Sequence, residues 1–253
     1  MFVVRVGEHF IAKYGANIRS IEGENMLFVK NHTTIPVPEV YAMYTFGEGN
    51  TMIIMEFIRG TTLQRYLRTQ GWQECNAVSK ELRAQVQELQ RIPAPPYYGA
   101  LGRRPIVDAY RSRELGPFDT SVEFVNATFD IMFSHRSSQR FADIKKFFSI
   151  SLNTVATALG HTHPVFTHGD IHEDNIIVRE DGMPVLIDYE MSGFYPAFQE
   201  GLVAERLDAE IDFIDDKFDE ERQIITDAHE AWVNAEIEEP SSENEESDSD
   251  DSQ

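Results

Sequence analysis

Four polar residues between positions 168 and 188 have the types and the spacing that phosphoryl transfer requires. The segment T-H-G-D-I-H-E-D-N places His168, Asp170 and Asn175 in the order H-x-D-x-x-x-x-N, and Asp188 follows further along the chain. Transfer from a nucleotide needs one carboxylate to take the proton of the acceptor hydroxyl, and an Asn and a second Asp to hold Mg²⁺ on the phosphates. The spacing therefore predicts Asp170 as the catalytic base and Asn175 and Asp188 as metal ligands.

A β-hairpin is expected to bring these residues together. Two short apolar runs, Ile176 to Val178 and Val185 to Ile187, are separated by Asp181-Gly182. That pair suits a tight turn because Gly accepts a positive φ. The motif loop enters this hairpin and Asp188 leaves it, so the polar side chains are expected to converge at its mouth.

The two motif segments also carry a family resemblance. H-G-D-I-H-E-D-N followed by I-D-Y-E-M-S-G-F-Y-P resembles the aminoglycoside phosphotransferase and choline kinase family, and most of all its fungal members. The resemblance implies an α+β, protein kinase-like fold of two lobes. A small N-terminal β-sheet lobe with one helix would precede a larger, mainly helical C-terminal lobe that carries the catalytic hairpin. Apolar periodicity over 76–92 and 121–132 predicts helices of that larger lobe.

ATP and Mg²⁺ are the cofactors that the resemblance implies, with a small-molecule hydroxyl as the acceptor of the γ-phosphate. Aminoglycosides and choline, the acceptors of the family, are cationic. Gly169 stands where regulated protein kinases carry the Arg of H-R-D, and only a few residues separate Asp188 from Pro196. Both features favour a constitutive small-molecule kinase over a protein kinase.

A lysine near the N-terminus is the candidate phosphate ligand. Residues 2–6 and 9–14 are expected to form two strands, and Lys13 lies near the end of the second. A helical pattern follows, with Glu24 in its first turn. By resemblance, Lys13 reaches the α- and β-phosphates and Glu24 holds it in place, with Glu22 as the alternative to Glu24. A lone lysine on an edge strand is otherwise usually solvated.

The segment M-I-I-M-E-F-I-R-G resembles the connection between the two lobes of the family. There the backbone near Glu56 and Ile58 would pair with the edge of adenine. The expected domain organisation is therefore 1–58 for the N-terminal lobe, 59–237 for the C-terminal catalytic and substrate lobe, and 238–253 for a disordered acidic tail. An ordinary buried strand followed by a helix cap would give the same pattern.

One feature departs from the family pattern. Kinases cover the phosphates with a Gly-rich turn between their first two strands, whereas this chain offers only Gly7-Glu8 before Lys13. Either that turn is a reduced substitute, or the first strand and its loop are missing from this chain. The departure favours an alternative function, a kinase-fold binding protein that has lost activity. Retention of the lysine, both aspartates and the asparagine favours the enzyme.

A second alternative treats the motif loop as a metallohydrolase site. His168, Asp170, His172 and Asp174 alternate along the loop, and mixtures of His and Asp suit Zn²⁺ or Mn²⁺. Two-metal sites need further ligands from other loops, and downstream the sequence offers His229 without a second cluster. Within the kinase interpretation, His172 is expected to be structural and Asp174 to cap a turn.

Composition limits the partners and the compartment. The chain has 253 residues, 42% hydrophobic, and a net charge of −21; nine acidic residues and no Lys or Arg lie within 236–253, which leaves −12 for the remainder. Such an acidic protein is not expected to bind nucleic acid or an anionic membrane. The single cysteine, Cys75, excludes an internal disulfide, and no apolar run approaches 18 residues. A cytoplasmic protein is expected.

Overall fold

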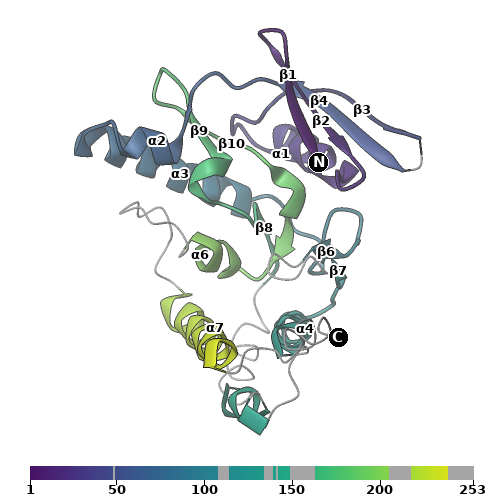
Figure 1. Cartoon of the computed structure of the whole chain (residues 1–253), viewed down its shortest axis with the longest axis vertical. Helices are drawn as coiled ribbons and strands as arrows, with labels where there is room; N and C mark the ends of the chain where they lie inside the picture. Colours follow the sequence, from purple (N-terminus) through teal and green to yellow (C-terminus); the bar gives the residue numbers. More distant parts are fainter. Residues whose placement is uncertain are drawn as a thin grey trace, which may run out of the picture.

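A computed structural model describes residues 1–47, 49–107, 114–133, 139–140, 142–148, 163–204 and 218–238. A small antiparallel sheet with one helix lies at one end of the molecule, and mainly helical structure lies at the other (Figure 1). This is the α+β arrangement predicted from the sequence. The predicted domain boundaries stay a prediction, and the acidic tail from 239 onward lies outside the described residues.

The N-terminal sheet places Lys13 on an inner strand. Its order is β1-β2-β4-β3, and Lys13 on β2 lies between Val3 of β1 and Ile53 of β4. Helix α1 packs against β3 and β4. Glycine at position 23 of this helix allows the close packing, because a Cβ there would lie 2.8 Å from the Met43 sulfur. The elements are β1 (Phe2–Val6), β2 (Phe10–Gly15), α1 (Ser20–His32), β3 (Val40–Phe46) and β4 (Asn50–Glu56).

Two short ladders hold the motif loop from both sides. The predicted hairpin is confirmed as β9 (Ile176–Val178) paired with β10 (Pro184–Leu186). A second ladder pairs β8 (Val165–Thr167) with β11 (Gly193–Tyr195), so the residues just after β8 and just before β11 are neighbours. The loop 168–175 and the segment 187–192 lie between the two ladders. Their backbones are therefore fixed at each end.

The hairpin is joined to the N-terminal lobe through a third strand. β5 (Thr61–Thr62) follows β4 after four residues and pairs with β9, which gives the order β10-β9-β5. At this junction Gly60 lies against the hairpin, because a Cβ there would be 2.3 Å from the Val178 carbonyl oxygen. Glycine is required here by the close approach of two backbones.

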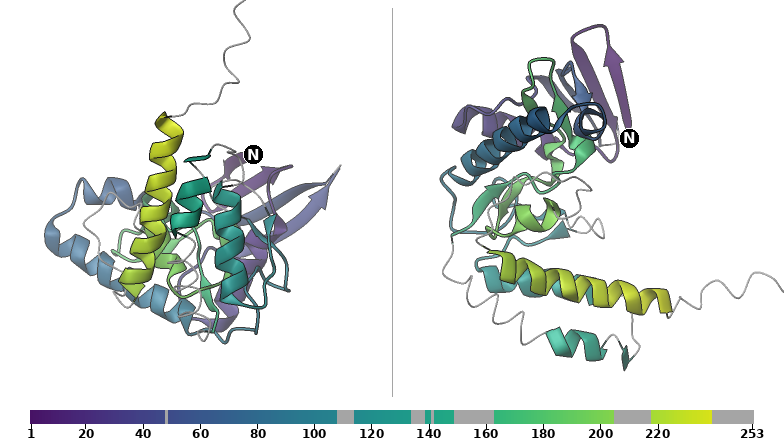
Figure 2. Two further views of the ribbon diagram at one scale, coloured as in Figure 1. Left: turned by 90° about the horizontal axis from the view of Figure 1, so that it is seen from below. Right: turned by 90° about the vertical axis from the view of Figure 1, so that its left-hand side faces the viewer.

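Two apolar clusters support this framework. One joins α1 and β4 to α2 (Leu63–Leu67), α3 (Trp72–Gln90) and buried hairpin residues such as Ile176. The other gathers α4 (Ser121–Phe133) and α7 (Asp219–Glu238), which lie together in the lower half of the molecule (Figure 2).

Helices were predicted over 76–92 and 121–132, and both are confirmed; the first begins earlier, at Trp72. No helix among the described residues has the length and apolar character needed to cross a bilayer. The remaining elements are β6 (Ile106–Val107), β7 (Glu114–Leu115), η1 (Glu173–Asn175), η2 (Tyr189–Met191) and α6 (Gln199–Ala204).

The Gly60 contact leads to a stability prediction. Gly60→Ala should lower the free energy of unfolding by about 1–3 kcal/mol, because the new methyl group meets backbone that cannot move aside without disturbing the hairpin. Urea denaturation measures the change. Gly71→Ala is the matched control, since its methyl group would meet only the mobile end of the Glu74 side chain. Equal losses in the two variants would contradict the prediction.

Candidate active site

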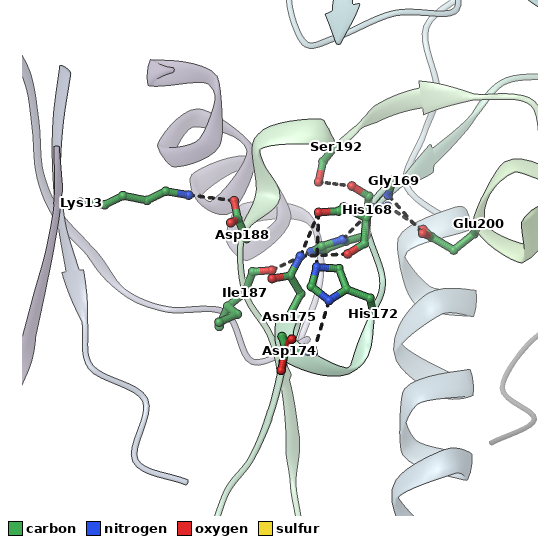
Figure 3. Close-up of polar contacts among 11 residues, drawn as sticks. Lys13, His168, Gly169, His172, Asp174, Asn175, Ile187, Asp188, Ser192 and Glu200 are labelled. Atoms are coloured by element: carbon green, nitrogen blue, oxygen red, sulfur yellow. Dashed lines mark hydrogen bonds and ion pairs between the residues drawn. The ribbon is translucent and has the colours of Figure 1, made fainter. Parts of the chain in front are cut away.

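Lys13 lies between two carboxylates that come from different parts of the chain. Its Nζ is 2.8 Å from Glu22 Oε2 on α1 and 2.9 Å from Asp188 Oδ1, which follows the hairpin. Figure 3 shows the lysine side chain extending from the sheet to Asp188. The lysine and Glu22 are almost completely buried, with side chains 5% and 1% exposed, whereas Asp188 is 29% exposed. The sheet, α1 and the hairpin therefore meet at one ammonium group.

Burial and charge act in opposite directions on this cluster. Burial lowers the pKa of Lys13, but Glu22 and Asp188 outweigh it and raise that pKa above its ordinary value. Burial raises the pKa of Glu22 to about 7, against the lowering effect of Lys13. The ammonium group therefore stays charged at neutral pH.

The expected partner of Lys13 was wrong, and the alternative is the one found. Glu24 turns away from the sheet, is only part-buried, and bonds Arg104 and Ser20. Two residues correspond to about 200° of rotation around a helix, so only one of Glu22 and Glu24 can face the sheet. The hydrogen bond from Arg104 lowers the pKa of Glu24.

The side chain of Asn175 is hydrogen-bonded to Asp170. The Asn175 Nδ2 group donates to Asp170 Oδ2 at 3.0 Å and to the Asp170 carbonyl oxygen at 3.0 Å. Asn175 belongs to η1 and is buried. Because both donations use its nitrogen, the amide oxygen of Asn175 is directed elsewhere and is the atom that could bind a cation.

His168 is a structural residue of the loop. Its Nε2 lies 3.0 Å from the Ile187 carbonyl oxygen and its Nδ1 accepts from the Asp170 N–H at 3.3 Å. These bonds assign the ring proton to Nε2. Complete burial lowers the pKa of His168 to about 4, so the ring is neutral at pH 7. Both ring nitrogens are engaged, which removes His168 from the metallohydrolase ligand set.

The loop after His168 is held by a glutamate that the sequence patterns did not single out. Glu200 on α6 accepts from the N–H of His168 at 2.6 Å and of Gly169 at 3.1 Å. Gly169 has φ +84°, and a Cβ there would lie 2.6 Å from the Met191 carbonyl oxygen. Glu200 is 1% exposed, and burial raises its pKa to about 7. Its only sequence signal is an acidic residue at the start of an apolar helix.

His172 caps η1, as a structural role for this residue requires. Its Nδ1 accepts from the Asp174 N–H at 3.3 Å, and its Nε2 lies 3.7 Å from Asp170 Oδ2. The second distance is too long for a hydrogen bond. Asp174 takes part through its backbone and its carboxylate is exposed. The predicted turn cap is therefore His172 and not Asp174.

Glu190 adds a third carboxylate beside Asp188 and was not predicted. Oxygen atoms of Glu22, Asp188 and Glu190 lie within 4.8 Å of one another, the one such group among the described residues. Burial and the neighbouring Asp188 raise the pKa of Glu190. The backbone of Asp188 adopts the left-handed conformation, with φ 64° and ψ 67°, which is costly outside glycine and is concentrated at functional sites. The spacing D-Y-E is the sequence signal for this group.

The Gly7-Glu8 turn does not lie over Lys13. Glu8 pairs with Arg59 at 3.2 Å, and the Phe57 N–H donates to the His9 carbonyl oxygen at 2.8 Å. The turn thus contacts the link between the lobes, and Lys13 is five residues after Glu8, about 17 Å along an extended strand. A role for this turn as a reduced phosphate cover was one of two expectations and stays a prediction; the contacts of the turn are with Arg59 and Phe57.

An open cavity of about 790 Å³ lies on another side of the hairpin. Its lining comes from α2, α3 and the hairpin turn and includes Tyr66, Glu81 and Asp181. None of Lys13, Asp170 and Asp188 lines it. We therefore locate the candidate site by its charged groups and not by this cavity.

The buried ion pair leads to a prediction that separates Glu22 from Glu24. Lys13→Met should lower the free energy of unfolding by about 3 kcal/mol, because it leaves the buried Glu22 carboxylate without its partner. Adding Glu22→Gln to that variant should restore part of the loss. Glu24→Gln, at a part-buried pair with Arg104 that solvent still reaches, should cost less than about 1 kcal/mol. Urea unfolding that shows equal losses for Lys13→Met and Glu24→Gln would contradict the assignment.

Glu200 leads to a prediction about pH. Its pKa is raised in the folded chain, so the stability linked to its proton is present below pH 4.5 and is lost as pH rises toward about 7. Glu200→Gln removes this dependence. The free energy of unfolding of Glu200→Gln minus that of wild type should therefore rise by up to about 3 kcal/mol between pH 4.5 and pH 8. A difference in unfolding free energy between the variant and wild type that stays constant over this pH range, measured by urea unfolding, would refute the raised pKa of Glu200.

Comparison with known proteins gives the fold and the family of this chain. No curated protein matches the chain. Among solved structures, a thermostable mutant of aminoglycoside phosphotransferase APH(4)-Ia in its apo form superposes with a TM-score of 0.57 at 13% identity, covering 93% of this chain and 84% of that one. APH(2")-IIia in complex with GDP and kanamycin gives 0.59 at 12% identity, covering 93% and 86%.

A third structure is a ternary complex of a thermostable APH(4)-Ia mutant with AMP-PNP and hygromycin B. It gives a TM-score of 0.59 at 13% identity and covers 91% of this chain and 78% of that chain. At such low identities the likeness establishes the fold, which is the protein kinase-like fold of aminoglycoside phosphotransferases. The sequence profile of the phosphotransferase enzyme family matches residues 19–218. Because that match spans most of the chain, this protein belongs to the phosphotransferase enzyme family.

Proposed function

We propose that the chain transfers the γ-phosphate of ATP, in a Mg²⁺-dependent reaction, to a hydroxyl group of a small molecule. The single observation that carries the proposal is the contact between Lys13 of the sheet and Asp188 of the hairpin, 2.9 Å apart. Phosphoryl transfer requires a cationic phosphate ligand next to a metal-binding carboxylate. These two groups meet here, although 175 positions separate them in the sequence.

The residues present fit a magnesium ion. Asp188, Glu190 and the amide oxygen of Asn175 are hard oxygen donors, the kind that Mg²⁺ prefers. The Asp188 side chain is partly exposed, so it can be reached by a nucleotide. Bound there, the ion would neutralise charge on the phosphates. Lys13 would add a second positive charge beside them.

Asp170 is the proposed base. Its Oδ2 accepts from Asn175 at 3.0 Å, which fixes the orientation of the carboxylate. As the acceptor oxygen bonds to the γ-phosphorus, its proton passes to Asp170, and the bond from that phosphorus to the leaving ADP oxygen breaks. Glu200 supports this step from a distance, because it holds the backbone of the loop in place.

Adenine is proposed to bind at the link between the lobes. The Glu56 N–H already donates to the Glu39 carbonyl oxygen, and the Phe57 N–H to that of His9, both at 2.8 Å. These bonds make Ile58 the preferred N–H donor to the base. A carbonyl oxygen such as that of Glu56 would accept from its amino group.

The acceptor is proposed to be a hydroxylated amine. The chain carries a net charge of −21, and Glu190 adds a carboxylate next to Asp188, so a cation is favoured over an anion. The structures similar in fold include complexes with kanamycin and with hygromycin B.

We propose that the protein acts in the cytoplasm, because its single cysteine cannot form an internal disulfide.

A nucleotide-binding protein without turnover is the second candidate function. It is favoured by the position of the Gly7-Glu8 turn, which contacts Arg59 and leaves the phosphate side of Lys13 uncovered by that turn. A phosphate site that this turn does not cover would bind phosphate less tightly and would admit water. The two candidates differ in turnover, which the following experiment measures.

Asp170→Asn and Asp188→Asn should fail in different ways. Mg-ATP at about 100 times its dissociation constant stabilises a folded protein by about 2.7 kcal/mol. In a domain of this size that raises the melting midpoint by about 5–10 °C. Wild type and Asp170→Asn should both show this shift, because the base is not needed for the nucleotide. Asp188→Asn should show a smaller shift, because it removes a metal-binding charge.

Turnover completes the test. ATP consumption is measured with kanamycin, hygromycin B and choline as probes, and wild type should be active whereas Asp170→Asn and Asp188→Asn should not. Glu24→Gln is the control that should stay active, since it removes a carboxylate that pairs with Arg104 and does not contact Lys13. A wild-type shift without turnover on a wide panel of hydroxylated amines selects the binding protein. Normal turnover by Asp170→Asn excludes Asp170 as the base.

A further inference from the structure

Asn25 is a fully buried polar residue that bridges the two lobes. It lies on α1 one turn after Glu22 and is 0% exposed. Its Nδ2 donates to the Tyr189 carbonyl oxygen at 2.7 Å and to the Ser192 carbonyl oxygen at 3.1 Å. Both acceptors are backbone atoms of the other lobe. A buried residue with two such bonds fixes the position of what it bonds.

The two acceptors are the ends of the segment that follows Asp188. Tyr189 is the next residue and begins η2, and Ser192 caps the end of η2. The Ser192 hydroxyl in turn donates to the His168 carbonyl oxygen at 2.8 Å. A continuous chain of hydrogen bonds therefore runs from α1 through η2 to the loop that carries Asp170.

We infer that Asn25 is a positioning residue that holds Asp188 opposite Lys13. The inference deepens the proposed function, because it rests on the roles given there to Lys13 and Asp188. Glu22 and Asn25 project from successive turns of α1: the first binds the ammonium group, and the second binds the backbone next to the carboxylate. One helix thus sets both sides of the ion pair.

Only an amide side chain meets the chemical requirement at this site. Two carbonyl oxygens must receive two donors from one short side chain, and the NH₂ group of Asn supplies both. Asp has the same shape without a donor, and Leu would remove both donors, which would leave the Tyr189 carbonyl oxygen with the Ser192 N–H at 3.2 Å. The left-handed backbone of Asp188 needs such a restraint, because few non-glycine residues hold that conformation unaided.

A double-mutant cycle tests the inference without a nucleotide. The coupling between Lys13→Met and Asp188→Asn in urea unfolding is measured in wild type, in Asn25→Ala and in Val29→Ala. Val29 is the matched control: it lies one turn further on α1, is also 0% exposed, and packs in the apolar core. The coupling should fall by at least half in Asn25→Ala and stay unchanged in Val29→Ala. Equal coupling in all three backgrounds overturns the inference.

A second measurement separates this inference from the proposed function. The rise in melting midpoint that Mg-ATP causes should mostly disappear in Asn25→Ala and should be retained in Val29→Ala. If wild type shows no shift, the proposed function fails, while the cycle still decides the role of Asn25. If Asn25→Ala does not fold, the cycle is run in Asn25→Ser, which retains one donor. Asn25 side-chain amide protons that exchange rapidly in wild type, observed by NMR, also overturn the inference.

Discussion

The structure depends on one buried positive charge. Lys13 is 4% exposed, and a charge so far from water is tolerated only where opposite charges surround it. Glu22 supplies one of them from α1 and Asp188 supplies the other from the hairpin. The two carboxylates belong to different lobes. Lys13 is therefore paired with both of them only where the two lobes are in contact. The geometry of the candidate active site is therefore also a condition for stable packing where the sheet, α1 and the hairpin meet.

Short strands and single hydrogen bonds do the rest of the positioning. The ladders β8–β11 and β9–β10 fix both ends of the motif loop, and Glu200 holds its first two residues through their backbone N–H groups. His168 serves the same purpose on the other side, since burial keeps it neutral and able to bond at both ring nitrogens. The motif therefore consists of residues proposed to take part in the reaction and residues that hold the backbone for them.

Sequence could predict the hairpin and the proximity of Asp170 and Asn175, because local spacing determines both. It could not choose between Glu22 and Glu24, since the side of α1 that faces the sheet depends on tertiary packing. Glu200 and Asn25 were missed for a related reason: each bonds backbone atoms far away in the sequence, and such partners leave no periodic pattern. The turn at Gly7 was recognised, but its location depends on the pairing of β2 with β4.

The surroundings of Lys13 also have a consequence for chemical labelling. Acylating reagents attack the neutral form of an amine, whereas Lys13 is buried and its neighbours hold it charged, with a raised pKa. Exposed lysines such as Lys30 and Lys80 lack the protection of burial. Amine-directed dyes, cross-linkers and solid supports can therefore be attached to the surface of this protein while the lysine of the candidate active site stays unmodified.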